Sequence, residues 1–118
     1  MNFKSILLGA ALAVSPVFGF ADSNIKMVVG TYTDAGSQGL YSFSFDQSTG
    51  KASGITSLKV DNPAYFTFSK DGRNIYAVSE KNNATAVLNS IGYDAVNGTF
   101  AFKNSQLTHG GDPCYVST

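Results

Sequence analysis

The chain repeats a short pattern of residues at a shift of 48 positions. The segment FSFDQSTGK, residues 43–51, aligns with IGYDAVNGT, residues 91–99, and each copy has an aspartate followed four positions later by a glycine. The matched pairs are Asp46 with Asp94 and Gly50 with Gly98. Such residues are typical of a turn between two strands. The repeat constrains the fold strongly, because a fixed period of this length indicates a repeat architecture.

A second pair of segments extends the repeat toward the C-terminus. NPAYFTF, residues 62–68, aligns with DPCYVST, residues 112–118, at a shift of 50. Between the turns the residues are apolar, β-branched or alternating, with no helical period, and nine Phe, six Tyr and twelve Gly suit short strands joined by tight turns. One unit therefore contains about four strands. Units of this length predict the blades of a β-propeller, which bury their faces only against neighbouring blades.

The two units differ in completeness. Residues 63–109 supply four strands, whereas MVVGTYT, residues 27–33, aligns with YAVSEKN, residues 76–82, which is the second strand of the later unit. We therefore expect the earlier blade to lack its innermost strand, a place that the other end of the chain can fill in a closed propeller. Residues 114–118 favour a strand, and we expect them to begin a following blade. The sequence predicts an all-β chain that supplies about the first two blades of a larger, truncated propeller.

The first 21 residues show the three parts of a secretory signal peptide. Lys4 supplies a positive charge, residues 6–14 are apolar, and small residues precede Asp22. A membrane anchor or a buried first helix is the alternative, but the apolar run is shorter than the roughly 20 residues that a membrane span needs. We expect an exported protein, periplasmic or secreted, in which residues 22–118 belong to the propeller and no membrane contact remains after leader cleavage.

Three segments together resemble a known family. They are, in order, VGTYTDAGSQGLYSFSFDQSTGKASG, NPAYFTFSKDGRNIYAVSE and GGDPCYVST, and they represent almost everything after the leader. They are similar to the opening of the lactonase family of seven-bladed propellers, which holds the propeller-type 6-phosphogluconolactonases and the fungal carboxymuconate cyclases. The middle segment occurs in many propellers, and the other two are more specific. A whole member would be about three times this length if each blade takes a similar number of residues.

This resemblance implies that a sugar lactone is hydrolysed by water at the mouth of the central channel, without an organic cofactor. The partners are then a small-molecule lactone and the remaining blades. The resemblance implies 6-phosphogluconolactone as the usual substrate. Export argues against it, because the sugar-phosphate pathway is cytosolic, and an unphosphorylated or extracellular lactone is the alternative. The alternative is a non-catalytic exported propeller that binds a glycan or a protein across its face. Nucleic acid is not expected as a partner, since eight basic and eight acidic residues balance.

Three residues are candidates for the site, and each has a structural alternative. The resemblance implies a histidine two residues after the proline of the third segment, but Tyr115 occupies that position. Tyr115 would be a poor base at neutral pH. The alternative is that it packs between blades as an aromatic strand residue. Glu80, the only glutamate, ends a strand and either polarises a water, holds sugar hydroxyls or is solvated. His109, the only histidine, lies in a glycine-flanked turn and is either an acid–base group or structural.

Other reactive groups are few. We expect Cys114, the only cysteine, to be a small buried strand residue, because Ala64 occupies the matching position; pairing between exported chains is the alternative. The sequence has no cluster of metal-ligating residues, no glycine-rich phosphate loop and no nucleophile elbow. Neither a metal nor a cofactor is therefore predicted.

Overall fold

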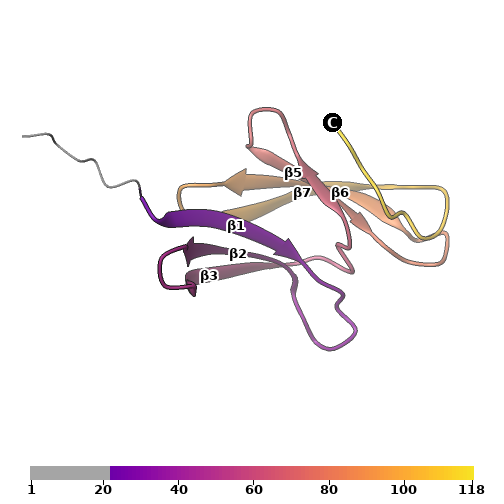
Figure 1. Cartoon of the computed structure of the whole chain (residues 1–118). Coiled ribbons are helices and arrows are strands. Elements are labelled where there is room, and N and C mark those ends of the chain that lie inside the picture. Colours follow the sequence, from indigo (N-terminus) through magenta and orange to yellow (C-terminus); the bar gives the residue numbers. More distant parts are fainter. Residues whose placement is uncertain (1–21) are drawn as a thin grey trace, which may run out of the picture.

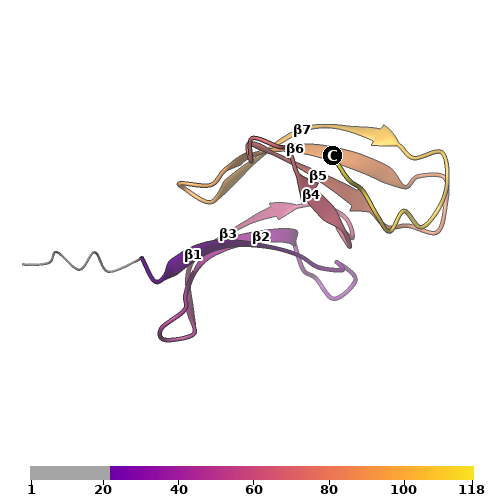
Figure 2. The same ribbon diagram turned by 45° about the horizontal axis from the view of Figure 1, so that its top comes forward.

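The computed structural model describes residues 22–118, which form two antiparallel sheets (Figure 1). The first sheet has the order β1-β2-β3 and the second has the order β4-β5-β6-β7. The strands are β1 (Asn24–Gly30), β2 (Gly39–Asp46), β3 (Lys51–Lys59), β4 (Phe66–Phe68), β5 (Asn74–Ser79), β6 (Val87–Asp94) and β7 (Thr99–Leu107). The predicted signal peptide, residues 1–21, lies outside the described residues. Figure 2 shows the two sheets as two layers that face each other.

The architecture confirms the all-β prediction and the unequal strand content of the two units. The earlier sheet has three strands and the later sheet has four, and β1 is the counterpart of β5, the second strand of its sheet. β4 has no counterpart within the described part of the first sheet. Within residues 22–118 the earlier unit therefore lacks the strand that begins the later unit, as the alignment of residues 27–33 with residues 76–82 predicts.

The repeated turns have the same structure in both sheets. In each turn the glycine N–H donates to the aspartate carbonyl oxygen, at 2.8 Å for Gly50 and Asp46 and at 2.7 Å for Gly98 and Asp94. Each aspartate side chain also accepts hydrogen bonds from the residues that follow it in the turn. An Asp side chain that caps its own turn in this way closes the hairpin locally. The repeat is thus a structural repeat as well as a sequence repeat.

Acid should weaken these turns, because hydrogen bonds from the hydroxyls of Ser48 and Thr49 hold the pKa of Asp46 well below its usual value. A lowered folded-state pKa contributes stability that is present above the unfolded pKa of about 4 and is lost as the pH falls toward the folded pKa. We expect Asp46→Asn to be less stable than the wild type near neutral pH. We expect this difference in unfolding free energy to shrink between about pH 5 and about pH 2. Denaturant titrations across this range measure it, and a difference that stays constant would contradict the prediction.

The main core lies between the two sheets. It consists of six buried side chains from both sheets, with Val28, Leu58, Phe66 and Phe100 packed against them: Leu40, Val60, Ile75, Ala77, Ile91 and Tyr93. A buried hydrogen bond of 2.9 Å joins the Ser42 hydroxyl on β2 to the Tyr93 hydroxyl on β6. Each sheet therefore buries one face against the other, as neighbouring blades do.

Two local predictions are wrong. Residues 114–118 do not form a strand, because a strand needs a hydrogen-bonded neighbour and no strand of the described chain pairs with them. One side-chain hydrogen bond reaches this segment, in which the Thr118 hydroxyl donates to the Phe68 carbonyl oxygen at 2.9 Å. Cys114 is exposed rather than buried, because it lies in this unpaired segment and no sheet covers it.

Candidate functional site

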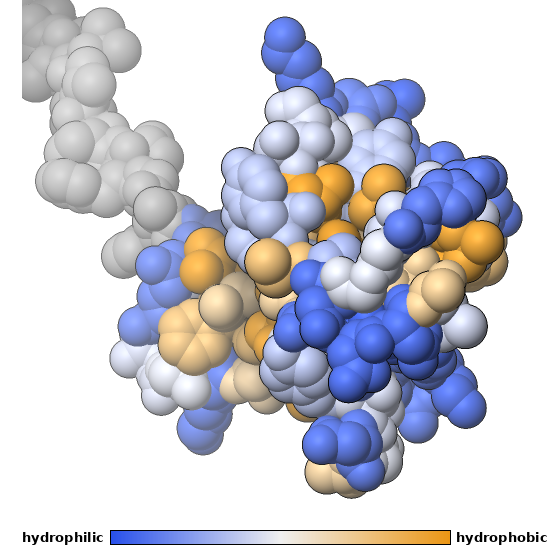
Figure 3. Space-filling model, turned by 90° about the vertical axis from the view of Figure 1, so that its right-hand side faces the viewer, coloured by the Kyte–Doolittle hydropathy of each residue, from blue (hydrophilic) through white to orange (hydrophobic). Residues whose placement is uncertain are grey.

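The strand directions place four connections at one end of the two sheets. They are residues 31–38, 60–65, 80–86 and 108–113, and we call this side the loop-bearing end; it lies at the right of Figure 1. The three hairpin turns, at residues 46–51, 69–73 and 94–99, lie at the opposite, hairpin end. Figure 3 views the loop-bearing end, where hydrophilic residues gather beside smaller apolar areas. Sites in propeller and barrel folds are usually built from such loops on a rigid scaffold.

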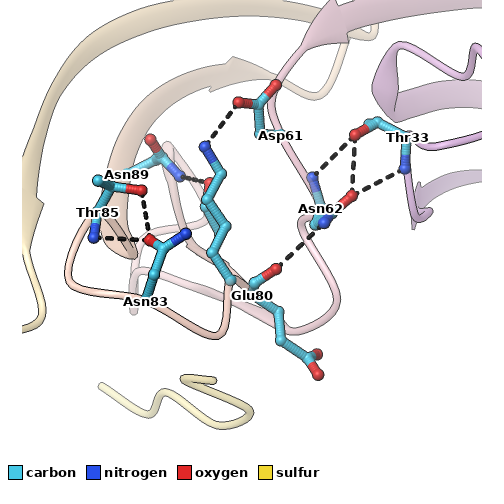
Figure 4. Close-up of polar contacts among 9 residues, drawn as sticks. Thr33, Asp61, Asn62, Glu80, Asn83, Thr85 and Asn89 are labelled. Carbon is cyan, nitrogen blue, oxygen red and sulfur yellow. Dashed lines mark hydrogen bonds and ion pairs between the residues drawn. The ribbon is translucent and has the colours of Figure 1, made fainter. Parts of the chain in front are cut away.

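Asn62 joins three segments at this end. Its side-chain oxygen accepts hydrogen bonds from the Thr33 backbone N–H and the Thr33 hydroxyl, both at 2.9 Å. Its side-chain N–H donates to the Glu80 carbonyl oxygen at 3.1 Å, and the Glu80 N–H donates to the Asn62 carbonyl oxygen at 3.0 Å (Figure 4). Asn62 has a positive φ of 40°, a conformation that asparagine tolerates better than most residues. The connection between the sheets, residues 60–65, is therefore hydrogen-bonded to the end of β5.

The same connection packs directly on two glycines of the first sheet. A Cβ atom at Gly30 would lie 2.2 Å from the Pro63 carbonyl oxygen, and one at Gly39 would lie 2.0 Å from the Val60 carbonyl oxygen. Both distances are shorter than any side chain permits, so the backbone of the connection occupies space that a Cβ would need. This close approach fixes where Asn62, and through it Glu80, can lie.

Glu80 is held by its side chain as well as by its backbone. Its Oε2 atom accepts a hydrogen bond of 2.9 Å from the Tyr32 hydroxyl, although the two residues are 48 positions apart. Its Oε1 atom accepts no hydrogen bond from the described residues. In Figure 4 the carboxylate extends away from the Asn62 contacts. Glu80 is partly exposed and Tyr32 is 55% exposed, so a solute can reach both.

The contact changes the acidity of Tyr32. The hydrogen bond to Glu80 raises the pKa of Tyr32 above its usual value, and burial and the charges of Glu80, Asp112 and Asp34 act in the same direction. Ionisation would remove the hydrogen bond and place a phenolate beside a carboxylate. We therefore expect Glu80→Gln to lower the pKa of this phenol. An ultraviolet titration of tyrosinate formation measures the shift, with Tyr32→Phe identifying the signal; an unchanged titration in Glu80→Gln would contradict the contact.

The other two predicted candidates lie close to this end but do not join Glu80. His109 is exposed, has a positive φ of 58° and belongs to the last connection. Tyr115 is 66% exposed and packs on Tyr65, with ring centroids 5.0 Å apart and ring planes at 44°. Among the described residues no hydrogen bond links any two of Glu80, His109 and Tyr115. Tyr115 thus contacts its repeat counterpart Tyr65, and the sequence reasoning missed the partners that Glu80 does have, Tyr32 and Asn62.

A polar groove of about 350 Å³ lies beside the Asn62 contacts, between the two sheets. Its lining includes Asp61, Lys81, Thr85, Asn89 and Phe102. Lys81 and Asp61 form an ion pair of 2.9 Å across it, with Asp61 labelled in Figure 4. The buried Asn89 donates to the Ala77 carbonyl oxygen and the Ser79 hydroxyl on the neighbouring strand. Polar side chains at the groove therefore already form hydrogen bonds and an ion pair within the described residues.

The described residues contain neither a cluster of metal ligands nor a membrane-spanning helix. Within residues 22–118, no three side chains of His, Cys, Asp or Glu gather where a metal ion could bind. The same residues include no helix with the length and apolar character needed to cross a membrane.

Comparison with known proteins identifies the fold family. The family described as "Lactonase, 7-bladed beta-propeller" matches residues 26–118. A 6-phosphogluconolactonase of Bacillus subtilis is 34% identical over 90 residues, which are 75% of this chain and 26% of that protein. A solved structure of a candidate 6-phosphogluconolactonase from Bacteroides fragilis has a TM-score of 0.77 and 39% identity, covering 82% of this chain and 27% of that one.

A second candidate 6-phosphogluconolactonase, from Bacteroides uniformis, has a TM-score of 0.76 and 43% identity, covering 81% of this chain and 28% of that chain. The chain thus spans about a quarter of the length of these relatives. Identity above a third over most of the chain, together with the two blade-like sheets, supports common ancestry rather than a shared architecture alone. The chain belongs to the lactonase family of seven-bladed β-propellers.

Proposed function

We propose that the full-length gene product is a lactone hydrolase that opens a sugar lactone with water. The observation that carries this proposal is the 34% identity over 90 residues with a protein named 6-phosphogluconolactonase. In the reaction, the oxygen of water bonds to the lactone carbonyl carbon and the ring C–O bond breaks. The ring oxygen leaves as a hydroxyl group and a carboxylic acid forms, so the reaction needs no redox cofactor.

We propose the loop-bearing end as the face that meets the substrate. Its best-placed polar group is Glu80, which is fixed by Asn62 and Tyr32 and is open to solvent. Glu80 is held at three points, two on its backbone and one on its carboxylate, so it is oriented before a ligand arrives. Such preorganisation lowers the entropy cost of binding. His109 and Tyr115 remain candidates by their position near the same end.

The substrate proposed here is an unphosphorylated sugar lactone outside the cytoplasm. The support is the signal-peptide pattern of residues 1–21, because a sugar phosphate is formed and used in the cytosol. The relatives are named for a phosphorylated lactone, so the two substrates have to be compared directly.

The test is the rate of ring opening by the full-length gene product with its leader removed. The 6-phosphorylated and the plain gluconolactone are each compared with their spontaneous hydrolysis at the same pH. We expect acceleration by several orders of magnitude, as enzymes commonly achieve, with plain gluconolactone preferred. A rate equal to the spontaneous rate for both lactones would contradict hydrolysis.

A binding module is the second candidate function. Three tyrosines close to the loop-bearing end are exposed, Tyr32 at 55%, Tyr65 at 40% and Tyr115 at 66%. Exposed aromatic rings are common in surfaces that bind a glycan or a protein. Absence of lactone hydrolysis together with tight glycan binding would favour this function.

A further inference from the structure

We infer that Tyr32 and Glu80 form a subsite that binds the hydroxyl groups of a neutral sugar ring. The inference deepens the proposed function and rests on it for the choice of ligand class. It assigns the specificity for a polyhydroxylated substrate to two side chains, Tyr32 in the connection after β1 and Glu80 at the end of β5. Tyr32 is a positioning residue for the carboxylate and also supplies an aromatic surface.

Hydrogen bonds hold both the backbone and one carboxylate oxygen of Glu80. The backbone N–H and carbonyl of Glu80 both bond to Asn62, at 3.0 and 3.1 Å, and the connection that carries Asn62 is packed on two glycines. The Tyr32 hydroxyl then holds Oε2 at 2.9 Å. A surface glutamate with free rotamers would lose this freedom on binding, whereas Glu80 has already lost much of it.

One carboxylate oxygen remains available for a ligand. An ionised carboxylate has about four acceptor positions and no donor. Tyr32 uses one position on Oε2, and the described residues use none on Oε1. The group that satisfies such an acceptor must be a donor, and a sugar hydroxyl is a donor of suitable size. A hydrogen bond to a charged acceptor is also stronger than a neutral one.

The charges of the described residues around the pair disfavour an anionic group as its ligand. Tyr32 lies within the electrostatic influence of three carboxylates, Glu80, Asp112 and Asp34. Lys81, the cation next to Glu80 in sequence, is paired with Asp61 at 2.9 Å. These carboxylates would repel a phosphate or a carboxylate, so we assign a neutral group as the ligand of the pair.

The aromatic ring supplies the second half of the recognition. Tyr32 is 55% exposed and its hydroxyl is held by Glu80, so part of its ring faces solvent in a fixed orientation. A sugar ring has an apolar C–H surface and a polar rim. A phenyl ring beside a carboxylate matches both, because small-molecule sites combine an apolar surface with a few oriented polar groups.

The test is equilibrium binding of 1,5-anhydroglucitol, a cyclic polyol that cannot be hydrolysed, to the full-length gene product by titration calorimetry. We expect Glu80→Gln to weaken binding about tenfold or more, because the charged acceptor is lost. Tyr32→Phe keeps the ring but frees the carboxylate, and we expect about a threefold to tenfold loss. Tyr76→Phe is the matched control, because the Tyr76 hydroxyl has no hydrogen-bond partner within residues 22–118, and it should bind as the wild type does.

Two outcomes would overturn the subsite. One is a wild type that binds no polyol or variants that bind it equally, with circular dichroism confirming that they are folded. The other is competition by inorganic phosphate at low millimolar concentration, which would mean that the pair accepts an anion. The ring-opening assay separates this inference from the proposed function. Hydrolysis with equal polyol binding in all variants refutes only the subsite, and polyol binding lost in the variants without hydrolysis refutes only the hydrolase.

Discussion

Replacing Gly39 with alanine is expected to lower the free energy of unfolding by more than about 3 kcal/mol. The residue has a φ of 101°, which costs a residue with a Cβ about 1 to 3 kcal/mol. The new Cβ would also lie 2.0 Å from the Val60 carbonyl oxygen and 3.2 Å from the Pro63 ring. These atoms belong to the connection between the sheets, so relief requires a backbone shift. The free energy of unfolding of a native domain is only about 5 to 15 kcal/mol. The loss should therefore be visible as a large fall in the denaturation midpoint.

Gly36→Ala separates the cost of the backbone conformation from the cost of the steric clash. Gly36 also has a positive φ, 85°, but a Cβ there would meet no atom within 4 Å. We expect it to cost only about 1 kcal/mol, the strain of the backbone conformation alone. The comparison by chemical denaturation of the full-length gene product is decisive. Equal losses for the two variants would show that the connection does not press on Gly39 as described.

Leu40→Ala is expected to cost about 2 to 5 kcal/mol, the usual range for removing a large side chain from a core. Leu40 is fully buried between the two sheets, where it belongs to the same cluster as Ile75 and Ile91 of the second sheet. Truncation would leave a cavity at the contact between neighbouring blades, and rigid strands on both sides limit its collapse.

Chemical denaturation measures this loss, and Val96→Ala provides the matched control. Val96 is 86% exposed in the turn between β6 and β7, so its truncation should change stability by less than about 0.5 kcal/mol. A loss below about 1 kcal/mol for Leu40→Ala would mean that the two sheets are not packed through this residue.

Local chemistry explains which parts of the fold could be predicted from the sequence. The turns at Asp46 and Asp94 are closed by their own side chains, so each is specified within a few residues. The alternation between such turns predicts strands, and the alignment of the repeats predicts that the earlier sheet has three strands and the later one four. These features need no knowledge of distant contacts.

The face that each strand buries could not be read in the same way. On β2 the aromatic residues Tyr41, Phe43 and Phe45 share one face, yet Leu40 and Ser42, on the other face, are buried against the second sheet. Ser42 is tolerated there because its hydroxyl bonds to Tyr93. In a stack of blades both faces of a sheet can meet a neighbour, so hydropathy alone does not identify the contact.

The candidate site was predicted only in part for a related reason. Glu80 could be singled out as the only glutamate, at the end of a strand, but its partner Tyr32 lies 48 residues earlier, in the connection after β1. That contact depends on how the connection between the sheets packs on Gly30 and Gly39, which is a tertiary effect. The available signal in the sequence was the asparagine before Pro63, because asparagine favours turns and tolerates the positive φ that Asn62 has in the structure.

Hydrogen–deuterium exchange on the full-length gene product tests most directly whether the ligand binds at the loop-bearing end. Amide exchange reports local opening segment by segment, so it can be compared with and without saturating 1,5-anhydroglucitol. We predict slower exchange in the four connections of the loop-bearing end, above all around Tyr32, Asn62 and Glu80, and unchanged exchange in the three turns of the hairpin end. Protection confined to the hairpin end, or no protection at either end, would contradict the account.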